Sequence, residues 1–325
     1  NPMKSKVALI IIYNHRYDKN IEVLENLYKT RFSNIYHLIP FYDGDKENVI
    51  AVYENSYRFQ GYISQAFRTF YKDMYDHYFF VADDLMLNPA INENNYSDCL
   101  NISPTASYFP VFLDFNDDDL KWMRIRGAIE YPHFVPGVEF HKELPSNEEA
   151  TRILRNAGFE LKPILYKNAY TSHIKLNFKK DIIEGESSLM NKTNTIIRYI
   201  INRIKSSIHT SRNKTFHLKY PMVGGYSDIF VVSKSCIKPF VRYCGIFATS
   251  QMFVEFAIPT ALLLSTKEIQ TEATIDYKGK ALWTEADYQM IAPFKNDLNQ
   301  LISNFPKNHL YLHPIKLSKW KFITE

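Results

Sequence analysis

Short, uninterrupted apolar runs alternate with helically spaced segments over the first ninety residues. The runs lie at positions 6–12, 35–42, 49–53 and 78–82. Runs of this length and composition are typical of strands buried on both faces of a sheet. Between them, residues 20–29 and 61–75 repeat apolar side chains at helical spacing, which predicts two helices. The order strand–helix–strand–strand–helix–strand predicts an α/β fold with a mostly parallel, doubly wound sheet flanked by helices.

The second half of the chain continues this pattern after an irregular stretch. Three further elements are expected from apolar runs: a buried strand at 229–232, a helix at 233–245 interrupted near Pro239, and a strongly apolar helix at 252–264. The stretch before them is polar and basic. There, residues 147–157 predict a short amphipathic helix, and 193–219 predict a helix followed by a loop. A basic run of this kind is usually a solvated face, but near an active site it could receive phosphate.

Residues 108–119 combine an apolar run with a cluster of acids. Positions 108–115 could form a strand, and Asn116 to Asp119 follow it directly. One interpretation of these acids is a second acidic motif. The simpler interpretation is the N-terminus of a helix that begins at Leu120, because Asn and Asp cap helices and their charge complements the helix dipole.

Two adjacent carboxylates, Asp83 and Asp84, follow the apolar and aromatic run 78–82. In an open α/β sheet, ligands bind in the crevice outside the carboxyl ends of the strands. Successive side chains of an extended chain point to opposite sides, so one acid is expected to hold a divalent ion and the other to reach ligand hydroxyls. The alternative is a surface turn that happens to carry two acids.

Other polar residues follow the first strands of the expected sheet. Asn14 and Arg16 come after the first strand, and Asp43 after the second. Because the carboxyl ends of parallel strands meet at one edge, we expect these side chains beside Asp83 and Asp84, in a nucleotide site. For any one of them, a solvated loop is the competing interpretation.

Further candidates lie near the end of the chain. Paired glycines at 224–225 precede Asp228, and glycine lets a backbone approach a ligand closely. Glu255 lies in an apolar helix, so its carboxylate must be paired, raised in pKa, or functional. The tail carries His313 and Lys316, a potential metal ligand and a potential phosphate-binding cation.

Composition narrows the classes of function. The chain has 325 residues, enough for a large core, and its net charge of +4 is too small to indicate nucleic-acid binding. It contains neither G-x-G-x-x-G nor a P-loop, and its three cysteines are too few for a disulfide scaffold. No run approaches the ~20 apolar residues of a membrane helix. We expect a cytoplasmic protein, with peripheral association at the inner face of a membrane, or alternatively the lumenal domain of an anchored enzyme.

Taken together, these motifs resemble those of GT-A nucleotide-sugar glycosyltransferases. The resemblance rests on the acids after the strand, the Gly-Gly-Tyr-Ser-Asp segment, the helix with Glu255 and the His-Pro-x-Lys tail. It implies that Asp84 and His313 bind Mn²⁺ or Mg²⁺ and that Asp83 reaches the metal or the ribose. Ala82 stands where the three-acid form of the family motif has its first acid, which puts part of the nucleotide contact in doubt.

The resemblance also implies roles for the other candidates. Lys316 would contact the donor diphosphate, and three residues would bind the nucleotide, UDP being the expected one: Asn14, Arg16 and Asp43. Gly225 and Asp228 would line the sugar or acceptor pocket, and Asp228 is grouped with Glu255 as a catalytic carboxylate. If the reaction inverts configuration, Glu255 would deprotonate the acceptor hydroxyl.

The implied function is a metal-dependent glycosyltransferase acting on a glycan or glycolipid, in surface polysaccharide or glycoconjugate synthesis. Residues 1–100 would form its nucleotide-binding half, 101–218 an insertion with connecting helices, and 219–325 the acceptor-binding half with the metal and diphosphate tail, all in one catalytic domain. Two alternatives remain: a sugar-nucleotide nucleotidyltransferase, although residues 13–19 lack the expected glycines, and a non-catalytic glycan-binding module with a decayed site.

Overall fold

The structure is a computed structural model that describes residues 6–115, 117, 120, 122, 124–170, 189–211 and 214–322. The chain divides into two compact units. The first combines residues Asn1–Phe112 with Gly224–Glu325, and the second is Leu113–Val223. The expected functional division, with boundaries after residues 100 and 218, stays a prediction.

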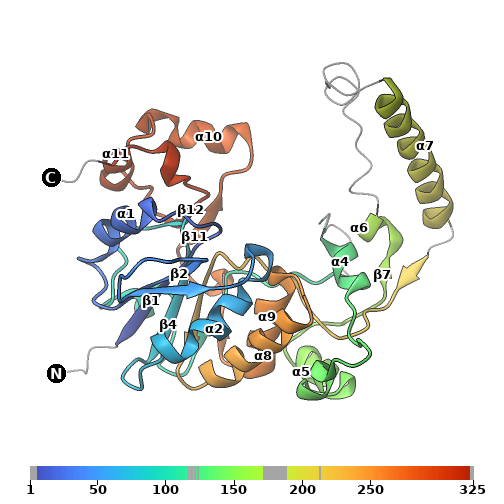
Figure 1. Ribbon diagram of the computed structural model, residues 1–325, viewed down its shortest axis with the longest axis horizontal. Helices are drawn as coiled ribbons and strands as arrows, with labels where there is room; N and C mark the ends of the chain where they lie inside the picture. The colour runs from blue at the N-terminus through green and yellow to red at the C-terminus, as the bar shows by residue number, and fades with distance from the viewer. Residues whose placement is uncertain are drawn as a thin grey trace. The chain divides into compact units, whose positions relative to one another are not determined.

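A seven-stranded mixed sheet forms the centre of the first unit (Figure 1). In spatial order its strands are β10 (Ile269–Gln270), β6 (Ser107–Tyr108), β9 (Ile229–Ser233), β4 (His77–Ala82), β1 (Val7–Ile12), β2 (Ile35–Pro40) and β3 (Val49–Val52). All neighbouring strands are parallel except β9, which is antiparallel to β4 and β6. The predicted α/β class with a mostly parallel sheet is confirmed. The chain runs from β1 to β2 and β3 on one side and returns to β4 on the other, so the strand order reverses between β1 and β4.

Helices cover both faces of this sheet, which explains why its strands are apolar without interruption. Phe79 and Val81 of β4 share a core with α1 (Lys19–Tyr28). Phe80 faces the other way and contacts Phe70 and Phe240. These two rings belong to α2 (Gln60–Phe70) and α8 (Ile237–Thr249), which pack against each other and against α9 (Val254–Ser265).

A second, three-stranded sheet holds the C-terminal segment beside β4 (Figure 1). It consists of β11 (Lys278–Ala281), β12 (His309–His313) and β5 (Met86–Leu87). The short strand β5 starts directly after the acidic pair and is antiparallel to β12, with Leu312 opposite Met86. The smaller helices of this unit are α3 (Tyr96–Cys99), α10 (Glu285–Ile291) and α11 (Leu298–Ser303).

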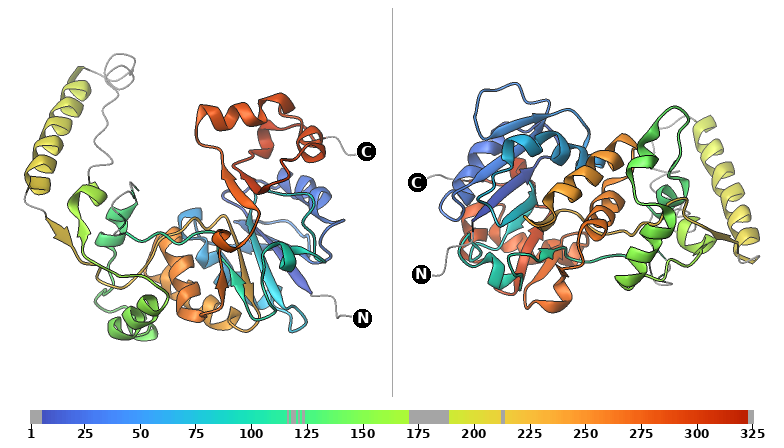
Figure 2. Two further views of the ribbon diagram at one scale, coloured as in Figure 1. Left: turned by 180° about the vertical axis from the view of Figure 1, so that it is seen from behind. Right: turned by 90° about the horizontal axis from the view of Figure 1, so that it is seen from below.

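The second unit is mostly helical (Figure 2). Its elements are α4 (Ile125–Glu130), α5 (Asn147–Asn156), the antiparallel strands β7 (Ile164–Leu165) and β8 (Thr215–Phe216), α6 (Tyr166–Tyr170) and α7 (Leu189–Ser211). Helix α5 begins at the cap Ser146, whose hydroxyl accepts from the Glu149 amide. The expected insertion at 101–218 stays a prediction.

Several predicted elements differ from the structure. Helix α2 ends at Phe70 rather than residue 75, because Tyr71 turns extended and its ring stacks on Tyr78. Helix α8 is continuous through Pro239, which lies in its first turn, where no intrahelical bond needs its missing N–H.

The predicted strand at 108–115 is wrong beyond its first residue, since β6 ends at Tyr108. After Tyr108 the Phe109 amide still donates to the Gln270 carbonyl of β10 (3.0 Å), but residues 110–115 belong to no strand. Of the predicted cap, Asn116, Asp118 and Asp119 lie outside the described residues; the next described helix, α4, starts at Ile125 rather than Leu120.

A buried hydrogen-bond network connects β1, β2 and α1. The Tyr13 hydroxyl lies 2.8 Å from Nδ1 of the fully buried His37, and Nε2 of that ring lies 2.8 Å from Glu25 Oε1. The hydrogen bond to His37 is the largest cause that lowers the pKa of Glu25. The network satisfies a tyrosine hydroxyl that would otherwise be buried without a partner.

We expect His37→Ala to destabilise the fold by ~2–4 kcal/mol, because it removes both hydrogen bonds and leaves the Tyr13 hydroxyl unpaired. Urea unfolding measures this.

Glu25 adds a pH dependence: its folded pKa is depressed, so its stabilisation is present above its unfolded pKa of about 4.3 and is lost as pH falls through the folded pKa. Glu25→Gln should lack that acid-dependent component. If the wild type and Glu25→Gln lost the same free energy of unfolding between pH 5 and 3, this would contradict the role of Glu25.

Candidate active site

The acidic pair lies where the strand order of the large sheet reverses. Asp83 donates its backbone N–H to the Ile12 carbonyl at the end of β1 (2.9 Å). In return, the Asn14 backbone N–H donates to Asp83 Oδ1 (3.2 Å), and its side-chain amide donates to Asp84 Oδ1 (3.4 Å). The two acids and Asn14 are therefore brought together, at the position where doubly wound sheets bind ligands.

A histidine from the C-terminal sheet lies between two of the acids. His313 Nε2 is 3.2 Å from Asp84 Oδ1, and its Nδ1 is 3.6 Å from Asp228 Oδ2. Asp228 immediately precedes β9, and its carbonyl accepts from the Ala82 amide at 2.8 Å. Because β9 is antiparallel to β4, the start of β9 and the end of β4 meet at one edge. The cluster thus contains Asp83, Asp84, Asp228, His313 and Asn14.

The acids and the histidine shift one another's protonation. Burial alone would lower the pKa of His313. The carboxylates of Asp228 and Asp84 have the larger combined effect and raise this pKa to about 9. Burial, and next the charge of Asp84, raise the pKa of Asp83 to about 7. The pKa of Asp228 is also raised by burial, although the positive charge of His313 opposes this. Such perturbed groups at one strand edge are typical of functional sites.

The side chains of this cluster supply some of the ligands that a divalent metal needs, but not a complete set. A carboxylate and an imidazole are suitable ligands for Mn²⁺, and Asp84 and His313 are already within hydrogen-bonding distance of each other. In the described part of the chain, no group of three or more His, Cys, Asp or Glu side chains is arranged to hold an ion. Mg²⁺ in phosphate-handling enzymes is commonly held by one or two side chains together with substrate phosphates, which is the arrangement that Asp84 and His313 could supply.

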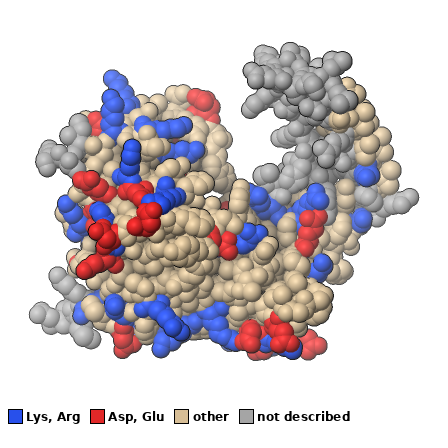
Figure 3. Space-filling view, viewed as in Figure 1, with Lys and Arg blue, Asp and Glu red and all other residues tan. Residues whose placement is uncertain are grey.

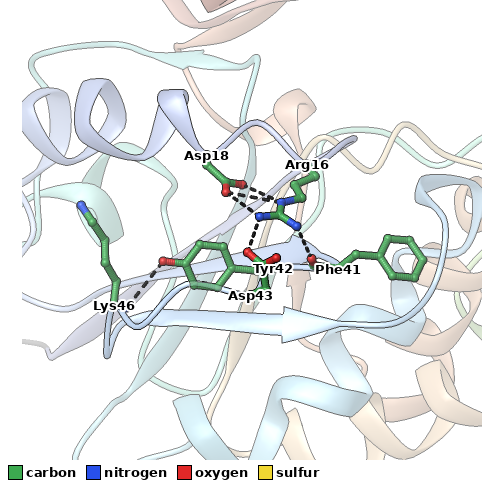
Figure 4. A network of polar contacts seen from close by, with 6 residues as sticks. All are labelled: Arg16, Asp18, Phe41, Tyr42, Asp43 and Lys46. Carbon is green, nitrogen blue, oxygen red and sulfur yellow. Dashed lines mark hydrogen bonds and ion pairs between the residues drawn. The ribbon is translucent and has the colours of Figure 1, made fainter.

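Arg16 and Asp43 form a separate surface cluster (Figure 4). The Arg16 guanidinium donates to Asp18 (3.0 Å), to Asp43 and to the Phe41 carbonyl (3.0 Å). These bonds to Asp18 and Asp43 raise the pKa of the arginine. Two carboxylates already balance the charge of Arg16. Although Arg16 lies near Asn14 in the sequence, it is therefore not a free cation. Beside it, the exposed rings of Phe41 and Tyr53 meet edge to face.

The glycine segment is tied to the first turn of α9. Pro259 has no N–H to donate to the Glu255 carbonyl four residues earlier, and the Gly225 amide donates to that carbonyl instead (2.9 Å). A Cβ on Gly225 would lie 2.4 Å from Phe109 Cε1, so close packing accounts for glycine here. Glu255 itself is half-buried in the first helical turn. Burial, followed by the charges of Glu255 and Asp228, raises the pKa of Tyr226.

The sequence did not indicate the aromatic pair beside the acids. Trp283 is 61% exposed, and its ring packs edge-on against Tyr226 at 5.3 Å. The neighbouring Leu282 amide donates to the His313 carbonyl (2.7 Å), so the backbone before Trp283 is fixed at the cluster. Trp283 has no spacing in the sequence that relates it to the acids, and it directly follows the apolar residues Ala281 and Leu282, so no pattern marked it.

Lys316 lies on the segment that passes the acidic pair. Its neighbour Ile315 donates a backbone N–H to the Asp84 carbonyl (2.6 Å), after a cis bond between His313 and Pro314. Lys316 is exposed, and its ammonium makes no ion pair with any residue that the structure describes. It is a cation whose charge remains available for a ligand.

Comparisons with protein-family models, with curated proteins and with solved structures found no match. Among the described helices, none is both long and apolar enough to cross a membrane. On the face drawn in Figure 3, Lys and Arg side chains are interspersed with Asp and Glu.

We expect Asp83→Asn to stabilise the protein without added metal, and to do so more at high pH. The raised pKa means that the folded state favours protonated Asp83. The stability linked to that proton is present below the unfolded pKa of about 3.9 and is lost as pH rises through about 7. Melting temperatures at pH 5 and 8 measure this; the gain at pH 8 should be on the order of 1–4 kcal/mol. Asp45→Asn, at an exposed acid, is the control. A loss of stability at both pH values would show that Asp83 is a structural acid.

Proposed function

We propose that this chain is a metal-dependent glycosyltransferase of the GT-A type, which moves a sugar from a nucleotide diphosphate donor to a glycan hydroxyl. The observation that carries the proposal is the cluster of Asp83, Asp84, Asp228 and His313 where the strand order reverses. Doubly wound sheets bind nucleotides at this position. The resemblance in sequence motifs supports the same class.

In this proposal Asp84 and His313 would hold Mn²⁺ or Mg²⁺. Bound there, the ion would neutralise charge that develops on the departing diphosphate. His313 must release a proton to bind metal, and its raised pKa makes that proton a competitor for the site. Lys316, exposed beside Asp84, would contact the same diphosphate as a second positive charge.

The nucleotide would lie over the end of β1. Asn14 is the best supported contact, because it is bonded to both acids. The exposed rings of Phe41 and Tyr53 offer a surface on which a base, expected to be uracil, could stack. Arg16 and Asp43 would act by holding the Phe41 loop, since the arginine donates to the Phe41 carbonyl.

The acceptor would approach from the α9 side. Glu255, in the first turn of that helix, is our candidate base for an acceptor hydroxyl, with Asp228 and Gly225 on the adjoining segment. The exposed face of Trp283 would pack against the apolar side of a sugar ring. Ala82, where the family motif has an acid, favours the alternative of a binding module with a decayed site. The strongly shifted pKa values of Asp83 and His313 argue against decay.

The first test of this function is metal binding. We expect the protein to bind Mn²⁺ together with a UDP-sugar and to release UDP, and Asp84→Asn or His313→Ala to weaken Mn²⁺ binding at least about tenfold, the usual loss when a metal site loses support. Titration of Mn²⁺ followed by its paramagnetic resonance signal measures binding apart from turnover. The control is His309→Ala, at the other end of the same strand. Unchanged Mn²⁺ affinity in both site variants would rule out this metal site.

The second test separates the base from the donor site. Glu255→Gln keeps the shape of the side chain, so folding and donor affinity should stay the same while transfer to the acceptor falls by ~10²–10⁴. Glu22→Gln, at an exposed acid in the first turn of α1, is the matched control. Donor affinity is measured by calorimetry and transfer by product formation. Normal transfer, or lost donor binding, would exclude Glu255 as the base.

A further inference from the structure

Helix α7 in the second unit carries a row of exposed isoleucines. It is 23 residues long, which at 1.5 Å per residue is about 35 Å. Five isoleucines are 44–55% exposed: Ile197, Ile200, Ile201, Ile204 and Ile208. Single exposed apolar residues are common on protein surfaces, but five on one helix are not explained in that way.

The five isoleucines lie on one side of the helix. At about 100° per residue, their positions fall within an arc of about 100°, the width of an apolar stripe that normally faces a core. Helix α7 packs against α6 in the described part of the chain, yet these side chains remain open to solvent. No element that the structure describes therefore covers this apolar stripe.

The charge of α7 is of one sign. Between Leu189 and Ser211 the sequence contains four Lys and Arg residues and no Asp or Glu. Two of the cations, Arg203 and Lys205, are exposed and lie on opposite sides of the isoleucine row. Arg203 also donates to the Tyr199 hydroxyl (3.0 Å), so its guanidinium is held beside an aromatic ring. Long cationic side chains on both edges of an apolar stripe are typical of helices that lie in a membrane interface.

We propose that α7 binds the surface of an anionic lipid bilayer, with its isoleucine row in the acyl boundary and its cations at the lipid headgroups. The helix does not meet the criteria for a membrane span, in agreement with a helix that lies in the plane of the interface. The one-signed charge favours lipid over a second copy of this helix, because two such helices would repel each other. This proposal stands independently of the glycosyltransferase activity.

The experiment measures binding of the full chain to vesicles of phosphatidylcholine, with or without phosphatidylglycerol as about a third of the lipid. Ile200→Asn with Ile204→Asn removes the centre of the row without touching a buried side chain. The matched control is Phe134→Asn with Val138→Asn, two exposed apolar residues of the same unit. A second variant, Arg203→Gln with Lys205→Gln, removes charge only. Circular dichroism and melting confirm that each variant is folded.

We expect the wild type to bind the anionic vesicles at least about tenfold more tightly than the neutral ones. The isoleucine variant should lose at least about tenfold in affinity, and the charge variant should lose most of the dependence on anionic lipid and on salt. The control should bind as the wild type does. Absence of wild-type binding to anionic vesicles, or equal binding by the isoleucine variant, would overturn the proposal. So would a wild-type dimer that the isoleucine variant abolishes, because the row would then be covered by a second copy.

Discussion

The position of His313 between Asp84 and Asp228 connects the two ends of the first unit. Carboxylates gathered at the end of a buried strand repel one another and resist desolvation, so they require a nearby positive charge. No Lys or Arg in the described part of the chain supplies it by direct contact; the imidazole does. The cation comes from near the other end of the sequence. The small three-stranded sheet positions that residue beside the acids.

The same requirement accounts for the path of the C-terminal tail. Strand β12 pairs with β5, which follows the acids directly, and Ile315 donates to the Asp84 carbonyl. Backbone bonds therefore hold the tail on both sides of His313. The α9 segment is fixed in a comparable way, by a hydrogen bond between Gly225 and the carbonyl that Pro259 leaves free. In both places a backbone hydrogen bond beside a proline fixes a segment that carries an ionisable residue.

The sequence was informative where a local pattern determines structure. The unbroken run before Asp83 predicts a strand buried on both faces, and Phe79 and Phe80 do face opposite cores. The proximity of the acids to Asn14 follows from parallel strands alone. The contact with His313 could be suggested only by resemblance, because the pairing of β12 with the two-residue β5 has no pattern of its own. Trp283 was missed for the same reason, since its position depends on Leu282 bonding to His313.

The protonation states of the cluster follow from this geometry and limit what the site can do. With Asp83 near pKa 7 and His313 near 9, the cluster at neutral pH has a positive imidazolium among acids, one of which is partly protonated. A divalent cation would supply more charge than the proton of His313 and would favour the ionised form of Asp83. Without such a cation, burial opposes the ionisation of Asp83, whereas the neighbouring acids stabilise the charged form of His313.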